Sequence, residues 1–279
     1  MRMKELEAFK SVVRKELFTH PVITDNAFTS WFAKGEADEE QVAELLTQFS
    51  VFSNHFLVLQ VKRMVNAGSL EGERCARNIL MNECGVGLDP RTGSVEGRTF
   101  ATGNAHLNWL REAGAALGLE PMQLGRWALG SDATHAFLDG LDKTYGSHDA
   151  MIGAGASFAI ECWAASGLGG GPRIEAGNFW RQLIRGLETV NGRRSAEARE
   201  LIPLGFFKFH AEIEAGHGVN VWRELEETFA QPGFDAKRFI RGGKKALDAI
   251  EVFWLGLDSS RRAHGRDALA GVNVCQWAL

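Results

Sequence analysis

Residues 206–218 read FFKFHAEIEAGHG, and this segment predicts both a long helix and the kind of site that the helix carries. His210, Glu214 and His217 are spaced by four and then three residues, so on an α-helix their side chains fall within an arc of roughly 60°. Phe206 and Ile213 project onto the same stripe, which is therefore expected to face the core. Two imidazoles and a carboxylate are costly to bury unless something satisfies them. A divalent or trivalent metal ion would do so.

Helical periodicity extends over most of the chain and predicts an all-α fold. Six prolines in 279 residues leave long uninterrupted segments, and alternating β-branched runs are nearly absent. Long helices joined by mostly short loops indicate an up-and-down bundle in one helical domain, residues 1–279, with an irregular C-terminal tail over 263–279. Asp38 and Ser195 supply the clearest helix-start signals. Helices are expected at 3–19, 38–67, 69–85, 103–118, 121–146, 148–167, 174–191, 195–230 and 235–262.

Composition limits the classes of function. The chain is 45% hydrophobic and 24% charged, with a net charge of −4, so it has no electrostatic footprint for nucleic acid. Its lysines and arginines are scattered, so the sequence does not predict binding to a membrane surface. No apolar run is long enough to be expected to span a membrane. The N-terminal segment lacks the apolar region of a secretion signal. Four cysteines without a regular spacing favour reduced thiols and a cytoplasmic location.

Three further residues are candidate metal ligands on other helices. Glu161 lies in ASFAIECWAASG among small and apolar residues, where a carboxylate is unusual unless it is paired. Glu83 closes the helix RCARNILMNECG on the same side as Ile79. His106 begins the helix after the long connection 85–104, and it would face Glu83 if that connection folds back.

In this order of ligands the chain resembles the haem-oxygenase-like dimetal oxidases and oxygenases. That family shows a Glu within N-E-x-G-x-G, then a His, a Glu in a small-residue helix, and a late H-x-x-x-[DE]-x-x-H helix. This chain has Asn82-Glu83-Cys84-Gly85-Val86-Gly87, followed by His106, Glu161 and the late helix. Its N-terminal part also resembles the family's opening pattern, at His20-Pro21, Gly35 and Gln48.

The resemblance implies a seven-helix fold that holds two irons and an O₂-dependent non-haem enzyme. The implied protein ligands, which are also the implied catalytic residues, are Glu83, His106, Glu161, His210, Glu214 and His217. The substrate would be a small organic molecule such as an amine, an amino acid or a fatty acid. It would be hydroxylated, N-oxygenated, desaturated or cleaved at a C–C bond. Iron and manganese both suit this mixed ligand set; an external electron donor and a homodimer are left open.

Three departures from the family pattern bear on this interpretation. The family usually has Asp where this chain has Glu214, and the Glu83–His106 separation is longer than usual. Some members also carry an extra carboxylate before the first Glu ligand. Here the preceding helix, QFSVFSNHFLVLQ, has no acidic residue, and Gln48, His55 or Gln60 would substitute only weakly.

Alternative interpretations remain open for individual residues and for the whole protein. Glu161 could pair with an arginine such as Arg126 or Arg181, Glu83 could be a solvated helix-end carboxylate, and His106 could have no ligand role. Cys84 and Cys162 adjoin candidate ligands and are expected to be core thiols.

The rival functions are a metal-free enzyme of the thiaminase type, with a Cys nucleophile and a nearby Glu, and a non-catalytic helical interaction domain. Haem is not expected, because His20 precedes Pro21 and so leaves the first helix.

Overall fold

The computed structural model describes residues 2–89, 93–168 and 177–274, except for the side chains of residues 2, 215–221 and 265–274. The described part of the chain contains α-helices, two short 3-10 helices and no strand, which confirms the all-α prediction. The α-helices are α1 (Arg2–Leu17), α2 (Pro21–Thr24), α3 (Ala27–Phe32), α4 (Glu39–Val65), α5 (Leu70–Glu83), α6 (His106–Ala115), α7 (Asp132–Thr144), α8 (Ala150–Ala165), α9 (Phe179–Ala196), α10 (Gly205–Ala230) and α11 (Ala236–Val274). The 3-10 helices are η1 (Thr102–Asn104) and η2 (Trp127–Leu129).

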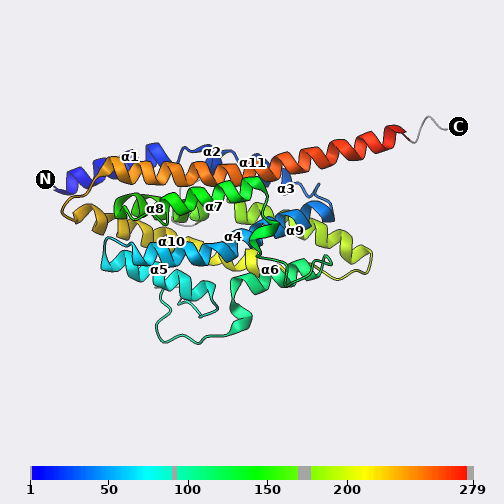
Figure 1. Ribbon diagram of the computed structural model, residues 1–279, viewed down its shortest axis with the longest axis horizontal. Coiled ribbons are helices and arrows are strands. Elements are labelled where there is room, and N and C mark those ends of the chain that lie inside the picture. The colour runs from blue at the N-terminus through cyan, green and yellow to red at the C-terminus, as the bar shows by residue number, and fades with distance from the viewer. Residues whose placement is uncertain (1, 90–92, 169–176, 275–279) are drawn as a thin grey trace.

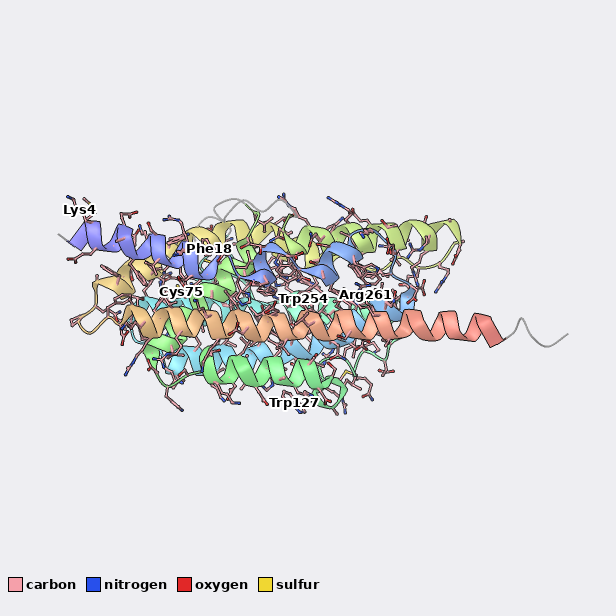
Figure 2. All side chains as sticks on the ribbon, turned by 90° about the horizontal axis from the view of Figure 1, so that it is seen from above. Lys4, Phe18, Cys75, Trp127, Trp254 and Arg261 are labelled. Atoms are coloured by element: carbon pink, nitrogen blue, oxygen red, sulfur yellow. The ribbon has the colours of Figure 1, made fainter. Side chains whose placement is uncertain are left out.

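The long helices run roughly along the long axis of the molecule in successive layers (Figure 1). α11 lies along one edge, packed against α8 and α7. α10, α4 and α9 form the middle of the bundle, and α5 and α6 lie on the edge opposite α11 (Figure 1). Seen from above, α1 and α7 lie on opposite sides of α11 (Figure 2). This arrangement surrounds the middle layer with helices on both sides.

α4 is the central helix of the bundle. Its start is fixed by a capping box, in which Asp38 accepts from Gln41 N at 2.8 Å and the Gln41 side chain accepts from Asp38 N at 3.1 Å. α4 is also the one described helix that is long and apolar enough, by length and composition, to cross a membrane. The sequence expectation that no segment reaches that threshold is therefore wrong. Because 56% of its apolar window is buried inside the bundle, α4 has the character of a core helix, which passes the same test.

Glycines allow α8 and α11 to approach closely. A Cβ added to Gly155 of α8 would lie 1.9 Å from the carbonyl oxygen of Phe239, and one added to Gly242 of α11 would lie 2.1 Å from that of Ile152. The backbones are therefore in direct contact, which only a residue without a side chain permits. This contact fixes α8, the helix that carries Glu161, against the longest helix of the molecule.

Several predicted boundaries are wrong, three of them for identifiable reasons. The predicted helix 195–230 begins only at Gly205, because Pro203 cannot donate a backbone hydrogen bond and disfavours helix at the residue before it; Ser195 lies instead in the last turn of α9. The predicted helix 121–146 begins at Asp132, since Gly125 has a φ of +86°. The irregular tail predicted for 263–279 is helical as far as Val274, because no proline interrupts it.

Candidate metal centre

An internal cavity lies between α4, α5, α8 and α10, with His106 of α6 at one end. The cavity is partly open to solvent. Its walls include all of the predicted ligands whose side chains are described, namely Glu83, His106, Glu161, His210 and Glu214. The side chain of His217, the sixth predicted ligand, lies outside the described residues. The cavity thus gathers five candidate ligands from four helices that are far apart in sequence.

Glu83 and His106 are brought together by the way α5 ends. Gly85 N–H donates to Asn82 O and Val86 N–H donates to Met81 O, both at 2.9 Å, which is the Schellman pattern with Gly85 in the position after the cap. Gly85 has a φ of +104°, and its Cα faces Ala101 O so closely that a Cβ would lie 2.5 Å from that oxygen. The connection therefore folds back on itself, as the sequence analysis required for His106 to face Glu83.

The returning connection is held by backbone hydrogen bonds. Ala101 N–H donates to Gly85 O at 3.0 Å, Gly87 N–H donates to Thr99 O at 3.1 Å, and the Asn82 side chain donates to Val86 O at 2.9 Å. α6 then begins at His106 itself, directly opposite the last residue of α5. The N-E-x-G-x-G segment thus has a local structural role, in which Asn82 and Gly85 shape the turn that places Glu83.

His106 is a buried imidazole whose hydrogen-bonding needs are unmet by the described residues. Its side chain is 2% exposed, and Nδ1 lies 2.9 Å from Oε2 of Glu83, within ion-pair distance. The contact lacks hydrogen-bond geometry, so neither ring nitrogen has a hydrogen-bond partner among the described residues. Leaving a buried polar group without a partner costs about 1–3 kcal/mol. A metal ion bound at this imidazole would remove that cost.

His210 is held in one tautomer, in which Nε2 is the nitrogen that can bind a metal ion. Its Nδ1–H donates to the carbonyl oxygen of Phe206 at 2.7 Å, so the lone pair of the neutral ring is on Nε2. The ring stacks on Trp180 at 4.7 Å between centroids and meets the ring of His106 edge-on at 4.8 Å. Aromatic side chains therefore fix the plane of this imidazole and keep water from it.

Glu83, His106 and His210 meet the geometric condition for a shared cation. Each offers one ligand atom, and these atoms all lie within 4.8 Å of one another. Glu214, one helical turn after His210, is 7% exposed and lines the same cavity, as does Glu161 of α8. Arg126 and Arg181, the alternative partners considered for Glu161, are both exposed on the surface. The predicted sites on α5, α6, α8 and α10 therefore lie on one cavity.

The donor set fits one or two hard or borderline cations. Three carboxylates and two imidazoles line the cavity, and mixed sets of this type suit iron or manganese. Among the described residues of the cavity wall, the lysine and arginine side chains are limited to Arg74 and Arg223. Arg74 is nine residues before Glu83, and Arg223 is thirteen after His210. Bound cations would balance the negative charge of the carboxylates.

The residues considered as substitutes for an extra carboxylate have other roles. Gln48 fixes the start of α7, because its Nε2 donates to Leu129 O at 3.0 Å and its Oε1 accepts from Ser131 N at 2.8 Å. His55 packs against the ring of Trp127 at 5.0 Å between centroids. None of Gln48, His55 and Gln60 belongs to the described cavity wall. Cys162 is buried as expected, but Cys84 is exposed, because it follows the last residue of α5 and points away from the core.

A buried ion pair that was not predicted from the sequence lies at the other end of the cavity. Arg63 of α4 donates to Glu224 of α10 at 2.7 Å, and the two side chains are 3% and 12% exposed. Burial raises the pKa of Glu224, while the Arg63 charge opposes that rise. The signal was present in the sequence, since Glu224 is ten residues after Glu214 and seven after His217, on the same helical stripe.

A second group of ligand-type side chains, His20, Asp248 and Glu251, lies near the surface. Both ring nitrogens of His20 already have partners within the protein. Nδ1 of His20 accepts from Val22 N–H at 3.2 Å as the N-cap of α2, so the ring proton is on Nε2, which faces Asp248 Oδ1 at 3.1 Å. A nitrogen that carries a proton cannot bind a metal ion. This group is therefore a helix cap with an ion-pair neighbour.

No protein-family model matches this chain, and no curated protein matches it either. The function proposed below is therefore supported by the donor set and its geometry.

Proposed function

We propose that this protein is an O₂-dependent non-haem diiron oxidase or oxygenase of the haem-oxygenase-like type. The observation that carries the proposal is the convergence of Glu83, His106 and His210, from three helices, to within 4.8 Å inside the bundle. His106 adds a second argument, because its buried nitrogens have no hydrogen-bond partner among the described residues. Glu161, Glu214 and His217 complete the proposed set of six ligands for two ions.

The residues of the chain would prepare this site in three ways. The carboxylates of Glu83, Glu161 and Glu214 would balance the charge of two cations. His210 would bind through Nε2, because Nδ1–H is held by Phe206 O. The apolar wall, which includes Phe52, Ile160 and Ile213, would hold an organic substrate and exclude water. Two ferrous ions bound there would supply the electrons that reduce O₂ beside the substrate. Manganese in one or both positions would fit the same donors.

The substrate proposed for this site is a small organic molecule that is hydroxylated, N-oxygenated, desaturated or cleaved. The thiaminase-type alternative is disfavoured by Cys75, the cysteine on the cavity wall. Burial raises the pKa of the Cys75 thiol to about 12, so it is not a thiolate at neutral pH. A nucleophilic cysteine needs the opposite shift. Cys162 is fully buried and its pKa is raised as well.

An anaerobic Fe(II) titration tests the proposal, with bound iron counted after gel filtration. We expect two irons per wild-type chain, a loss of at least one in His210→Gln and in Glu214→Gln, and O₂ uptake by the loaded protein on exposure to air. The matched controls are His148→Gln, on a surface histidine that contacts Asn66, and Glu212→Gln, on an exposed carboxylate of α10. Both controls should bind two irons. A wild-type stoichiometry near zero for iron and for manganese would refute the proposal.

A further inference from the structure

Exposed apolar side chains form a stripe on the outer face of α4. Val58, Val61 and Val65 are 48%, 42% and 73% exposed, and their spacing of three and then four residues puts them on one side of the helix. The loop before α7 adds large apolar side chains that are also exposed, namely Met122, Trp127 and Leu129.

The loop continues the stripe of α4. Leu129 O accepts from Gln48 Nε2 at 3.0 Å, so one part of the loop is fixed beside the first half of α4. The ring of Trp127 packs against His55 at 5.0 Å between centroids, and Val58 lies three residues further along the helix. In Figure 2 Trp127 lies on the α7 side of the molecule, away from α1. The loop residues and the three valines therefore form one surface, called the apolar strip below, beside residues 48–65 of α4.

The apolar strip has the size and composition of a protein–protein contact. Between residues 48 and 65 α4 rises about 26 Å, and the strip together with α7 is two helices, or about 20 Å, wide. That area is of the same order as the roughly 800 Å² that each partner buries in a standard interface. Tryptophan and methionine are enriched at such interfaces. An exposed apolar surface of this extent is typical of an interaction site.

α7 borders the apolar strip in a fixed register with α4. Lys62 pairs with Asp142, and Asn66 Nδ2 donates to Gly146 O at 3.1 Å; the residues of each pair are 80 positions apart. Asp139, one turn before Asp142 on the same side of α7, therefore lies level with residue 59 of α4.

Arg126 and Asp139 are the charges on this border that are available to a partner. Both are exposed, and neither forms an ion pair with any described residue. Arg126 precedes Trp127, so it lies level with about residue 55 of α4. The middle of the apolar strip, near Val58, thus lies between a cation on one side and a carboxylate on the other.

The other charged side chains nearby are paired or directed elsewhere. Lys62 and Asp142 neutralise each other. Glu120 turns back on its own loop, where it accepts from Met122 N–H at 3.4 Å. Lys143 points about 100° further round α7 than Asp142, away from α4. The border therefore carries no net charge that would make the apolar strip repel a second copy of itself.

We propose that the apolar strip is the contact between two copies of this chain. A two-fold axis near Val58 would set the two α4 helices antiparallel and cover each stripe of valines with the other copy's strip. The same axis would place Arg126 of each copy opposite Asp139 of the other, because their levels on α4 lie on either side of it. A contact that uses one surface twice needs this kind of self-complementarity. Carboxylates beside the strip disfavour an anionic membrane surface as the occupant.

Sedimentation equilibrium of the full chain at several concentrations tests the proposal. We expect the wild-type protein to be a dimer and Val61→Glu to raise the dissociation constant of the dimer by about tenfold or more. Val12→Glu is the matched control, on an α1 valine that is 45% exposed, and should dimerise like the wild-type protein. Circular dichroism should show the same helical content in all three.

A charge exchange tests the orientation of the two copies. Arg126→Glu alone and Asp139→Lys alone should each weaken the dimer, and the double variant Arg126→Glu/Asp139→Lys should recover part of the loss. Additive losses in the double variant would overturn the proposed pairing.

The remaining outcomes decide whether the contact exists. A wild-type chain that is monomeric at every concentration would overturn the inference, and so would a Val61→Glu variant that dimerises as tightly as the wild-type protein. Binding of a monomeric wild-type chain to phosphatidylcholine vesicles would assign the apolar strip to a membrane instead. None of these measurements uses a metal, so a dimer that takes up no iron would support this inference and refute the diiron function.

Discussion

At the scale of single residues, the two histidines differ in how their rings are held. His210 has a fixed tautomer and an aromatic neighbour on its face, so the orientation of its ring is set without a bound cation. The side chain of His106 is buried, and its Nδ1 lies within ion-pair distance of Oε2 of Glu83 without a hydrogen bond. A bound cation would therefore change the surroundings of His106 more than those of His210.

The buried pair Arg63–Glu224 gives a prediction for stability at the same scale. Arg63→Met leaves the Glu224 carboxylate without a partner and should lower the free energy of unfolding by about 3–5 kcal/mol at pH 8. The double variant Arg63→Met/Glu224→Leu should recover most of that loss. Urea denaturation of the wild-type protein and both variants measures these differences.

The loss in Arg63→Met should depend on pH in one direction. Burial raises the pKa of Glu224 already in the wild-type protein, and removal of Arg63 takes away the charge that opposes the rise. A carboxyl whose pKa is higher in the folded than in the unfolded state binds its proton more tightly when folded, so stability increases as the pH falls through the folded pKa. The loss should therefore shrink between pH 8 and pH 5. A loss below 1 kcal/mol that is equal at both pH values would contradict this account.

At the scale of elements, the turn after α5 decides whether His106 reaches Glu83. Gly85→Ala should lower the free energy of unfolding by about 1–3 kcal/mol. The φ of +104° at Gly85 is strained for any other residue, and the new Cβ would lie 2.5 Å from Ala101 O. Since this turn positions both Glu83 and α6, the variant should also bind less iron while its helical circular dichroism is retained.

Gly97→Ala is the matched control for the turn. Gly97 lies in the same connection and has a φ of +69°, but a Cβ there meets nothing within 4 Å. The Gly97→Ala substitution should lower the free energy of unfolding by about 1–2 kcal/mol through backbone strain alone. The iron stoichiometry should stay at the wild-type value. Equal iron binding by the two variants would show that the close approach at Gly85 does not position the ligands.

At the scale of the whole molecule, the contact between α8 and α11 determines where Glu161 stands. Gly155→Ala would place a Cβ 1.9 Å from Phe239 O, and a backbone atom of a packed helix cannot move away without shifting the helix. We expect a loss of about 3 kcal/mol in unfolding free energy, measured by thermal and urea denaturation. Gly192→Ala of α9, where a Cβ meets nothing within 4 Å, should instead stabilise the protein by about 0.5–1 kcal/mol. Similar effects of the two substitutions would contradict the close packing.

The sequence by itself determined the helical class and the inward stripe of α10. Helical periodicity depends on local spacing, so His210 and Glu214 could be placed on a buried face without knowledge of the other helices. The capping residue Asp38 was also found, because a cap depends on a few neighbouring residues. Breaks at Gly125 and Pro203 were missed, since the surrounding residues kept an apolar pattern that outweighed one breaker.

Only the tertiary structure decided which side chains share a cavity. That His106 lies 2.9 Å from Glu83 depends on a turn whose backbone returns along itself, and that Arg63 pairs with Glu224 depends on the packing of α4 against α10. Contacts between residues 23 or 161 positions apart are set by how helices pack. The spacing of residues within one helix does not predict which helices pack against it. The set of side chains that lines the cavity could therefore be recognised only in the folded molecule.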